Sequence, residues 1–351
     1  MLKKLIASNF TVFPSLELTF SPGLNIIVGE NGAGKSHLLK LAYVLCAVSA
    51  SMNKSPRQSK DEWQKRVADK LVATCRPDYL GRLVSRAQGR NRCEVAVAFS
   101  QPKDAGFKFS FATNARSEVK IEAMPAACLV APPVFIPTRE MLSIYPGFVA
   151  AYEDRHLEFD DTYYDLAKAL GASARKKHAG QVQALIDSLE NLLDGHIRQE
   201  GGRFYLWPNK AGVGKIEIPL LAEGPRKLGM LAYLLINGAL RDRGTLFWDE
   251  PETNLNPKLM VVTAKALFSL AQQGYQVVLA THSLFLLREL EILQRQAKTA
   301  VPMRFVGLSL NDEDVQVEQA NDITNIQTLV LLDEELHQSD RYLALDNEAA
   351  K

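Results

Sequence analysis

The sequence lacks three features that would each favour a particular architecture. It contains no internal repeat, no low-complexity block and no sustained heptad pattern, so neither a repeat array nor a long coiled coil is expected. Its most apolar helix-like stretch, Leu38 to Ala50, is too short to span a membrane. No N-terminal signal peptide is evident, and we therefore expect a cytoplasmic protein with no membrane partner.

Cysteine is also scarce. The chain of 351 residues has four cysteines, and their spacing matches neither a zinc site nor a disulfide framework. We interpret them as reduced thiols, as expected for a protein of a reducing compartment. The four residues are Cys46, Cys75, Cys93 and Cys128.

Charge is nearly balanced overall but unevenly distributed. The formal net charge is +1, and the contents of 47% apolar and 23% charged residues are ordinary for a globular protein. Residues 54–92 contain eleven Lys or Arg against four acids, whereas residues 311–351 contain eleven acids against two basic residues. Two interpretations of the basic segment stay open: it attracts nucleic acid, or it is a solvated helical face.

The most informative feature is a glycine-rich loop between an apolar run and a helical pattern. The run from Leu24 to Val28 predicts a buried strand, and helical patterning begins at Lys35. The loop fits the phosphate-binding pattern G-x-x-x-x-G-K-[ST] in its expected strand–loop–helix context. We predict that it binds ATP, with Lys35 on the β- and γ-phosphates and Ser36 on Mg²⁺. The loop consists of Gly29, Glu30, Asn31, Gly32, Ala33, Gly34, Lys35 and Ser36.

Two further apolar runs end in residues suited to hydrolysis of a bound triphosphate. Residues 245–248 lead into Asp249 and Glu250, and residues 276–280 lead towards His282. Because parallel strands present their carboxyl ends at one edge of a sheet, these residues are expected near the phosphate loop. We predict that Asp249 holds Mg²⁺ and that Glu250 polarises the attacking water. His282 is predicted to contact the γ-phosphate or that water.

The remaining patterns predict a mixed α/β chain. Two short strands precede the glycine loop, and strand patterns recur between residues 94 and 122. Helical patterns dominate residues 146–194, and Gly201-Gly202 fits the turn of a hairpin. Residues 215–219 predict one more strand, and residues 223–240 predict a helix that leads to the Asp-Glu strand.

These motifs together resemble those of ABC-class ATPases of the SMC/OLD type, which include compact AAA-family ATPases of bacterial anti-phage systems. From Asp249 the chain reads D-E-P-E-T-N-L-N-P, and the resemblance covers the phosphate loop and about residues 221–287. It implies an α/β head with a mixed nucleotide-binding sheet, an antiparallel β subdomain and a helical lobe. It also implies one domain in two lobes, with residues 1–135 and 241–351 binding the nucleotide and residues 136–240 forming the helical lobe.

In this family two heads enclose two ATP molecules, so the resemblance implies a homodimer or a higher oligomer. Asn254 and Asn256 are then candidates for the dimer interface. The segment Ser8 to Phe13 is similar to the "Asn-Phe" start that lies near the adenine in the family. Arg139 and Glu140 occupy the lobe junction, where the family usually has a glutamine that senses Mg²⁺.

One family feature is missing. Where relatives carry a Ser-Gly-Gly or Ser-Ser-Gly signature, this chain has L-A-E-G-P-R-K at residues 221–227, which resembles a variant of the defence-type ATPases. Without a signature serine, Gly224, Arg226 and Lys227 are the candidates for contacting phosphate. Pro225 also fits the first turn of an ordinary helix. A nucleotide-driven switch is therefore favoured over rapid turnover.

Three functions fit these observations. The leading hypothesis is a dimeric ATP-gated switch that controls a separately encoded nuclease or toxin, because the sequence shows no acidic cluster of the TOPRIM kind. The second is a DNA repair or recombination ATPase that binds nucleic acid through residues 54–92. The third, the energy subunit of a membrane transporter, is disfavoured by the missing Ser-Gly-Gly.

Overall fold

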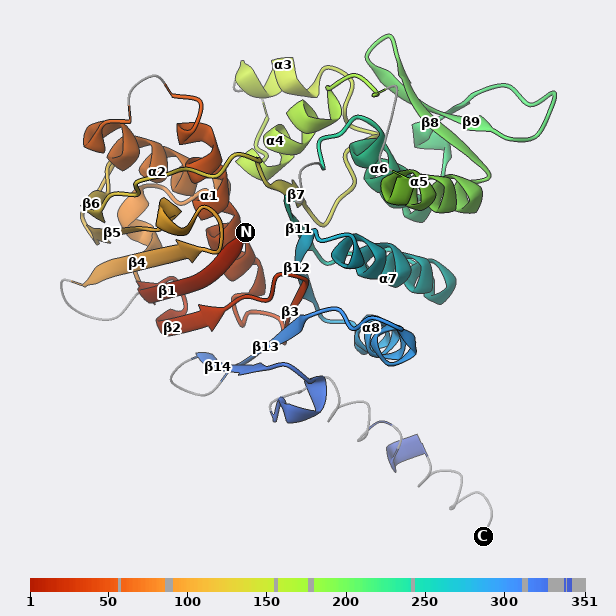
Figure 1. The fold of residues 1–351 in the computed structure, drawn as a ribbon. Helices are drawn as coiled ribbons and strands as arrows, with labels where there is room; N and C mark the ends of the chain where they lie inside the picture. The colour runs from red at the N-terminus through yellow and green to blue at the C-terminus, as the bar shows by residue number, and fades with distance from the viewer. Residues whose placement is uncertain are drawn as a thin grey trace.

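The structure is a computed structural model of the chain. It describes residues 1–55, 58–85, 91–154, 157–175, 180–240, 244–310, 315–327, 338 and 340–342. Within these residues a central sheet stands between two layers, with an antiparallel sheet and its helices on one side and a layer of helices with a small sheet on the other (Figure 1).

The central sheet has six strands in the order β14-β13-β3-β12-β11-β7. Neighbouring strands are parallel, except for β14, which runs antiparallel to β13. Every residue of β3, β11 and β12 is buried, which is why these strands read as continuous apolar runs. Their carboxyl ends lie at one edge of the sheet and bring three sequence motifs together there. The strands are β3 (Leu24–Gly29), β7 (Val134–Ile136), β11 (Thr245–Asp249), β12 (Gln276–Thr281), β13 (Met303–Leu310) and β14 (Val315–Ala320).

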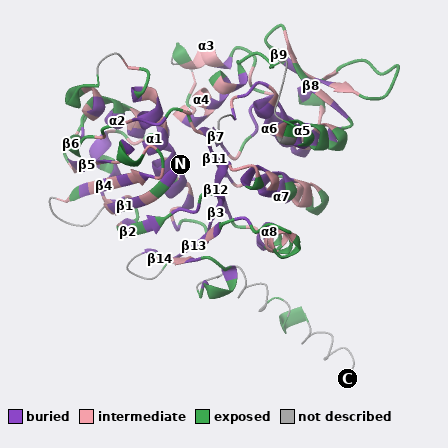
Figure 2. Cartoon of the chain, in the orientation of Figure 1, coloured by how far each residue is buried: buried purple, intermediate pink, exposed green. Residues whose placement is uncertain are grey.

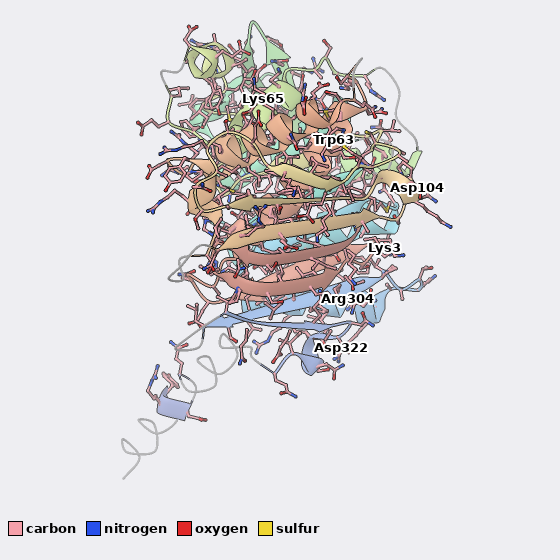
Figure 3. The ribbon with its side chains drawn as sticks, turned by 90° about the vertical axis from the view of Figure 1, so that its left-hand side faces the viewer. Lys3, Trp63, Lys65, Asp104, Arg304 and Asp322 are labelled. Atoms are coloured by element: carbon pink, nitrogen blue, oxygen red, sulfur yellow. The ribbon has the colours of Figure 1, made fainter. Side chains whose placement is uncertain are left out.

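A five-stranded antiparallel sheet, in the order β2-β1-β4-β5-β6, forms the outer layer. Its inner side chains share a core with α1 and α2, and Trp63 of α2 is fully buried against Phe107. The outer face carries ion pairs such as Lys4–Glu17, and Figure 3 views the molecule from this side. The elements are β1 (Leu2–Phe10), β2 (Phe13–Thr19), α1 (Lys35–Met52), α2 (Lys60–Cys75), β4 (Arg92–Phe99), β5 (Phe107–Ala112) and β6 (Lys120–Ala123).

Helices and a small sheet cover the opposite face of the central sheet (Figure 1). Side chains of β3 alternate between the two layers, with Ile26 and Val28 in this core and Ile27 in the other. Figure 2 shows the buried residues gathered along the central sheet and the helices that pack on it. The elements are α3 (Phe148–Glu153), α4 (Asp161–Leu170), α5 (Gly180–Leu193), β8 (Gly195–Glu200), β9 (Arg203–Pro208), β10 (Ile216–Glu217), α6 (Glu223–Ile236), α7 (Pro257–Gln272) and α8 (Leu284–Gln296). Short 3-10 turns occur at Leu80–Leu83, Lys103–Ala105, Ile218–Leu220 and Ile323–Asn325.

The predicted fold class is confirmed, and two predicted element boundaries are wrong. The hairpin turns at Gly201 and Gly202, both in the left-handed region, as predicted. The strand predicted over 215–219 is reduced to Ile216–Glu217, because the chain continues as a 3-10 turn containing Pro219. The helix predicted to reach Leu240 ends at Ile236, since Gly238 adopts a φ of +73°. The division into two lobes at residues 135/136 and 240/241 stays a prediction.

A partly buried polar cluster ties α4 to the helix that follows the phosphate loop. Lys40 of α1 forms an ion pair with Asp160 at 2.8 Å, and Tyr43 of α1 donates a hydrogen bond to Asp165. Lys70 of α2 pairs with Asp165 as well. Contacts with α4 on one side of the central sheet and packing with α2 on the other therefore fix the position of α1. The start of that helix at Lys35 is fixed with it.

None of the helices in the described part of the chain combines the length and the apolar character that a membrane span requires. The longest, α1, has 18 residues. The four cysteines are unpaired, and burial raises the pKa of Cys46 and of Cys75 to about 12.

Candidate functional site

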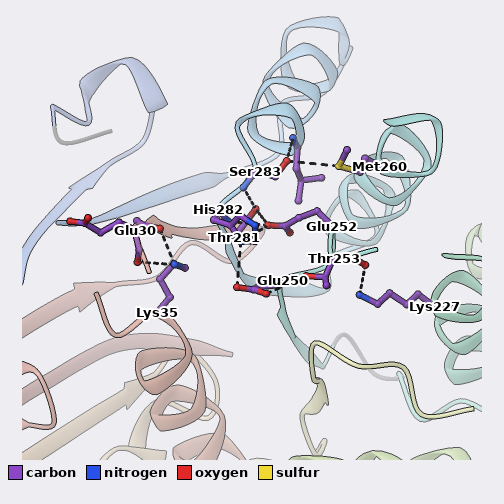
Figure 4. A network of polar contacts seen from close by, with 12 residues as sticks. Glu30, Lys35, Lys227, Glu250, Glu252, Thr253, Met260, Thr281, His282 and Ser283 are labelled. Carbon is purple, nitrogen blue, oxygen red and sulfur yellow. Dashed lines mark hydrogen bonds and ion pairs between the residues drawn. The ribbon is translucent and has the colours of Figure 1, made fainter. Parts of the chain in front are cut away.

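The phosphate-binding loop leaves β3 at Gly29 and enters α1 at Lys35. Gly32 and Gly34 both adopt a φ of +88°, a left-handed conformation that glycine tolerates and that turns backbone N–H groups towards an anion. The Lys35 ammonium lies across the loop and donates to the carbonyls of Gly29 at 2.8 Å and Glu30 at 2.9 Å (Figure 4). Burial lowers the pKa of Lys35, and the carboxylates of Glu250 and Asp249 oppose that effect. The lysine is thus held where phosphate oxygens would replace the carbonyls.

The β1–β2 turn packs directly on this loop. A methyl group at Gly34 would lie 2.6 Å from Val12 Cγ2 and 2.7 Å from Phe13 Cζ, so no larger residue fits there. Val12 keeps 36% of its surface exposed. The segment singled out by its Asn-Phe start therefore lies beside the phosphate loop, with an apolar side chain at its rim.

Asp249 ends β11 beside the phosphate loop and is only 7% exposed. Burial raises its pKa from 3.8 to about 6, while a hydrogen bond from the Ser36 hydroxyl acts in the opposite direction. Its Oδ1 atom is buried and has no hydrogen-bond partner among the described residues. A hydroxyl and a carboxylate oxygen are ligands that Mg²⁺ accepts, with phosphate oxygens and water completing its shell. The two residues therefore fit the predicted metal. The described residues contain no cluster of three His, Cys, Asp or Glu for a metal held by protein alone.

The raised pKa of Asp249 predicts that binding of Mg²⁺ at this site is sensitive to acid. Below pH 6 the carboxyl takes up a proton, and a protonated carboxyl is a poor ligand for Mg²⁺. We expect the affinity for Mg²⁺, measured by titration of the ATP-bound protein, to fall by about tenfold per pH unit below that value. Asp249→Asn has no carboxyl to titrate and serves as the control. The same pH dependence in both proteins would assign the effect to another group.

Glu250 and His282, the two predicted catalytic residues, lie side by side. Glu250 Oε1 is 3.3 Å from His282 Nδ1, although the two residues follow different strands (Figure 4). Glu250 Oε2 accepts a hydrogen bond of 3.2 Å from the Thr253 hydroxyl. The Glu250 backbone has a φ of +48°, which is strained for a residue with a side chain. Side-chain exposures of 26% for Glu250 and 45% for His282 leave both accessible to a bound substrate.

The sequence did not single out Glu252, whose side chain is 5% exposed. Its Oε1 atom accepts hydrogen bonds from the Thr281 hydroxyl at 2.7 Å and from the His282 N–H at 3.0 Å. Ser283 then caps α8 by accepting from Leu286 N–H. Glu252 therefore fixes the backbone that presents His282. The only signal in the sequence was its place two residues after Glu250 in the D-E-P-E stretch.

The segment that replaces the signature begins α6, and its two cations point into the protein. Arg226 forms an ion pair with Glu140 at 2.8 Å, and its side chain is 20% exposed. Lys227 is fully buried and donates to the Thr253 carbonyl at 2.7 Å. A methyl group at Gly224 would lie 2.5 Å from Leu259 Cδ1, so this glycine lets α6 approach α7 closely. In this arrangement both cations hold the chain's own elements together.

The residues predicted at the interface and at the lobe junction are also placed. The Asn254 amide donates to Glu223 Oε2 at 2.8 Å, and Asn256 caps α7. Glu140 is buried and accepts from the Ser143 hydroxyl as well as from Arg226, whereas Arg139 is exposed. The lobe junction is therefore tied to the start of α6 through Glu140.

Comparison with known proteins agrees with this geometry. Residues 137–288 match the family model described as "AAA domain, putative AbiEii toxin, Type IV TA system", and residues 4–122 match a second model described as "AAA domain". The crystal structure of the Smc head bound to the C-winged-helix domain of ScpA is 15% identical and has a TM-score of 0.52 over 91% of this chain and 97% of that one. The chain thus matches models of AAA domains over these two segments and has the fold of an SMC head. A Smc head with an extended coiled coil from Pyrococcus furiosus, 13% identical, has a TM-score of 0.51 over 91% of this chain and 96% of its own.

Curated relatives are similar to this chain over shorter segments. The DNA replication and repair protein RecF of Limosilactobacillus fermentum is 32% identical over 104 residues, which are 28% of this chain and 24% of that protein. RecF of Cytophaga hutchinsonii is 38% identical over 58 residues, which are 16% of this chain and 15% of that protein. The chain thus matches at most about a quarter of the length of these two relatives.

Proposed function

We propose that this protein is a dimeric switch that closes on ATP and reopens when ATP is hydrolysed. The observation that carries the proposal is the convergence of Lys35, Asp249, Glu250 and His282 at one edge of the central sheet. Lys227 lies on the far side of Glu250 from Lys35 (Figure 4). The start of α6 is therefore apart from the chain's own phosphate loop, as expected if it serves the loop of a second copy.

Each residue of the site has a chemical task in this proposal. Lys35 and the loop N–H groups bind the β- and γ-phosphates, which carry most of the charge of the substrate. Mg²⁺, held by Ser36 and Asp249, supplies neutralisation of that charge. Glu250 accepts the proton of the attacking water, and His282 donates a hydrogen bond to the γ-phosphate or orients the water. Phosphate release from Mg-ATP by the purified protein, compared with that of Glu250→Gln, tests this assignment.

The second head provides the other half of the composite site. The N-terminus of α6, with the Gly224 N–H, would face the phosphates of the partner copy, where the positive end of the helix dipole favours an anion. Asn254 and Asn256 would lie at the interface. Arg226 and Lys227 point into the protein. Either residue could therefore contact phosphate directly only after a rearrangement of α6.

We further propose that the switch controls a separate effector, such as a nuclease or toxin, in anti-phage defence. The support is the resemblance to defence-type ATPases and the description of the matching family model as a putative toxin of a type IV system. The described residues contain no cluster suited to a catalytic metal held by protein side chains alone, so a cleaving activity would come from the partner.

A second candidate output is action on nucleic acid, which the RecF relatives favour. Part of the basic segment, residues 56–57 and 86–90, lies outside the described residues. The described part contacts the turn that packs on the phosphate loop, since Thr11 N–H donates to the Leu83 carbonyl and Ser85 N–H donates to the Asn9 carbonyl. Binding of nucleic acid to this segment would therefore affect the β1–β2 turn, which packs on the phosphate loop.

Neutralising the basic segment tests this output. We expect the combined change of Arg82, Arg86, Arg90 and Arg92 to Gln to weaken duplex DNA binding and to reduce the slope of log K against log salt by up to about 4. Arg86 and Arg90 belong to the residues outside the described ranges, whereas Arg82 and Arg92 are exposed. The control neutralises the exposed Arg198, Arg203, Lys210 and Lys215 of the small sheet region. Equal DNA affinity of the two variants would reject this output.

A further inference from the structure

The buried ammonium of Lys227 is bonded to the loop that carries Glu250. Lys227 is the fifth residue of α6 and is fully buried, and its Nζ lies 2.7 Å from the Thr253 carbonyl oxygen. Burying an ammonium is costly unless it is paired, and burial lowers the pKa of Lys227 accordingly. A methionine of similar length would avoid that cost, so packing alone does not explain a lysine at this position.

The same threonine reaches Glu250 through its side chain. The Thr253 hydroxyl donates to Glu250 Oε2 at 3.2 Å, and the Thr253 N–H donates to the Glu250 carbonyl at 3.2 Å. One residue thus accepts a hydrogen bond from α6 and donates one to the carboxylate. The contacts form a continuous path from Lys227 through Thr253 to Glu250 (Figure 4).

A second contact ties this loop to α6. Asn254 donates to the Glu223 carboxylate at 2.8 Å, and Glu223 is the first residue of the helix. Glu250 and Asn254, at the two ends of the loop, have φ values of +48° and +61°. Strained conformations of this kind persist only where surrounding contacts hold them. A displacement of α6 would therefore be transmitted to the Glu250 carboxylate.

We propose that Lys227 and Thr253 are positioning residues that set the Glu250 carboxylate according to the position of α6. The proposal rests on the proposed function, in which Glu250 is the base and the start of α6 faces the nucleotide of the second copy. In this arrangement α6 contacts the nucleotide of the partner copy. Lys227 and Thr253 then make the position of the chain's own Glu250 carboxylate depend on that contact. Hydrolysis at the two sites of the dimer is coupled as a result.

The sharpest test removes the Thr253 hydroxyl in one variant and retains a hydroxyl at this position in another. We expect Thr253→Val to lower kcat for ATP hydrolysis by about tenfold, since misplacement of a catalytic group slows the reaction without changing substrate affinity. The Kd of a fluorescent ATP analogue and KM should stay within about twofold, and Thr253→Ser should restore kcat to within the same factor. Thr263→Val is the matched control, because Thr263 is a buried threonine of α7 whose hydroxyl, within the described part of the chain, donates to the Leu259 carbonyl of its own helix.

Lys227→Met tests the other end of the path. We expect a similar loss of kcat, and the double variant with Thr253→Val should be little worse than either single variant, because both changes interrupt one path. Retained kcat in both single variants, or a Thr253→Ser protein as slow as Thr253→Val, overturns the inference. Should Lys227→Met not fold, the two threonine variants decide the matter alone.

The Glu250→Gln protein separates this inference from the proposed function. If Glu250→Gln loses hydrolysis while Thr253→Val and Lys227→Met hydrolyse normally, only the positioning role is wrong. If Glu250→Gln hydrolyses ATP at the rate of the unchanged protein, Glu250 is not the base, and the inference is overturned together with the proposed function.

Discussion

Replacement of Glu250 by Gln is expected to slow ATP hydrolysis by about 10²–10⁴-fold, the usual contribution of a general base. Gln has the same shape and can still accept the hydrogen bond that the Thr253 hydroxyl gives to Glu250, but it cannot take a proton from water. Binding of ATP should therefore be unchanged. Phosphate release and equilibrium binding of a labelled nucleotide measure the two quantities separately.

The control for this variant is Glu17→Gln, which removes a carboxylate that is 65% exposed on the outer sheet. It should hydrolyse ATP at the unchanged rate. A Glu250→Gln protein that turns over ATP as fast as Glu17→Gln would show that another group activates the water, and His282 would be the next residue to replace.

Lys35→Ala is expected to weaken ATP binding by at least about 100-fold, since charged hydrogen bonds worth about 3 kcal/mol together are lost. The ammonium already lies across the loop on the carbonyls of Gly29 and Glu30, so it needs little movement to reach a phosphate. Isothermal titration with ATP measures the change. Lys120→Ala, which removes an exposed lysine of β6, is the control, and equal ATP affinity of the two variants would contradict the assigned role.

The core of the site was predictable because it depends on local patterns and one topological rule. Buried parallel strands are continuous apolar runs, and their carboxyl ends meet at one edge of the sheet. Asp249, Glu250 and His282 each follow such a run, so their approach to the phosphate loop followed from the sequence. The pairing of Glu250 with His282 at 3.3 Å agrees with this reasoning.

The orientation of the α6 cations was not predictable in the same way. A lysine or arginine in the first turns of a helix faces solvent or an anion in many proteins, and nothing local distinguishes the other case. Here the close approach of α6 to α7 at Gly224 and the position of the loop at Thr253 turn Lys227 inward. Arg226 pairs with Glu140, which is 86 residues away in the chain. Such contacts depend on tertiary packing.

The role of Glu252 could not be predicted from the sequence either. Its position two residues after Glu250 suggested that it belongs to the same motif, but it did not indicate what the side chain contacts. Its role depends on the neighbouring strand β12, which ends with the hydroxyl of Thr281 and leads to the His282 N–H within reach of the carboxylate. Only the pairing of β11 with β12 supplies that geometry.

The central claim is that ATP joins two copies of this chain around a composite site. The most direct measurement is the mass of Glu250→Gln in solution by sedimentation velocity, without nucleotide and with Mg-ATP at a concentration that saturates ATP binding. The account predicts a monomer without nucleotide and a dimer with Mg-ATP, and it predicts that Lys35→Ala stays monomeric in both. A Glu250→Gln protein that is saturated with ATP and still sediments as a monomer would contradict it.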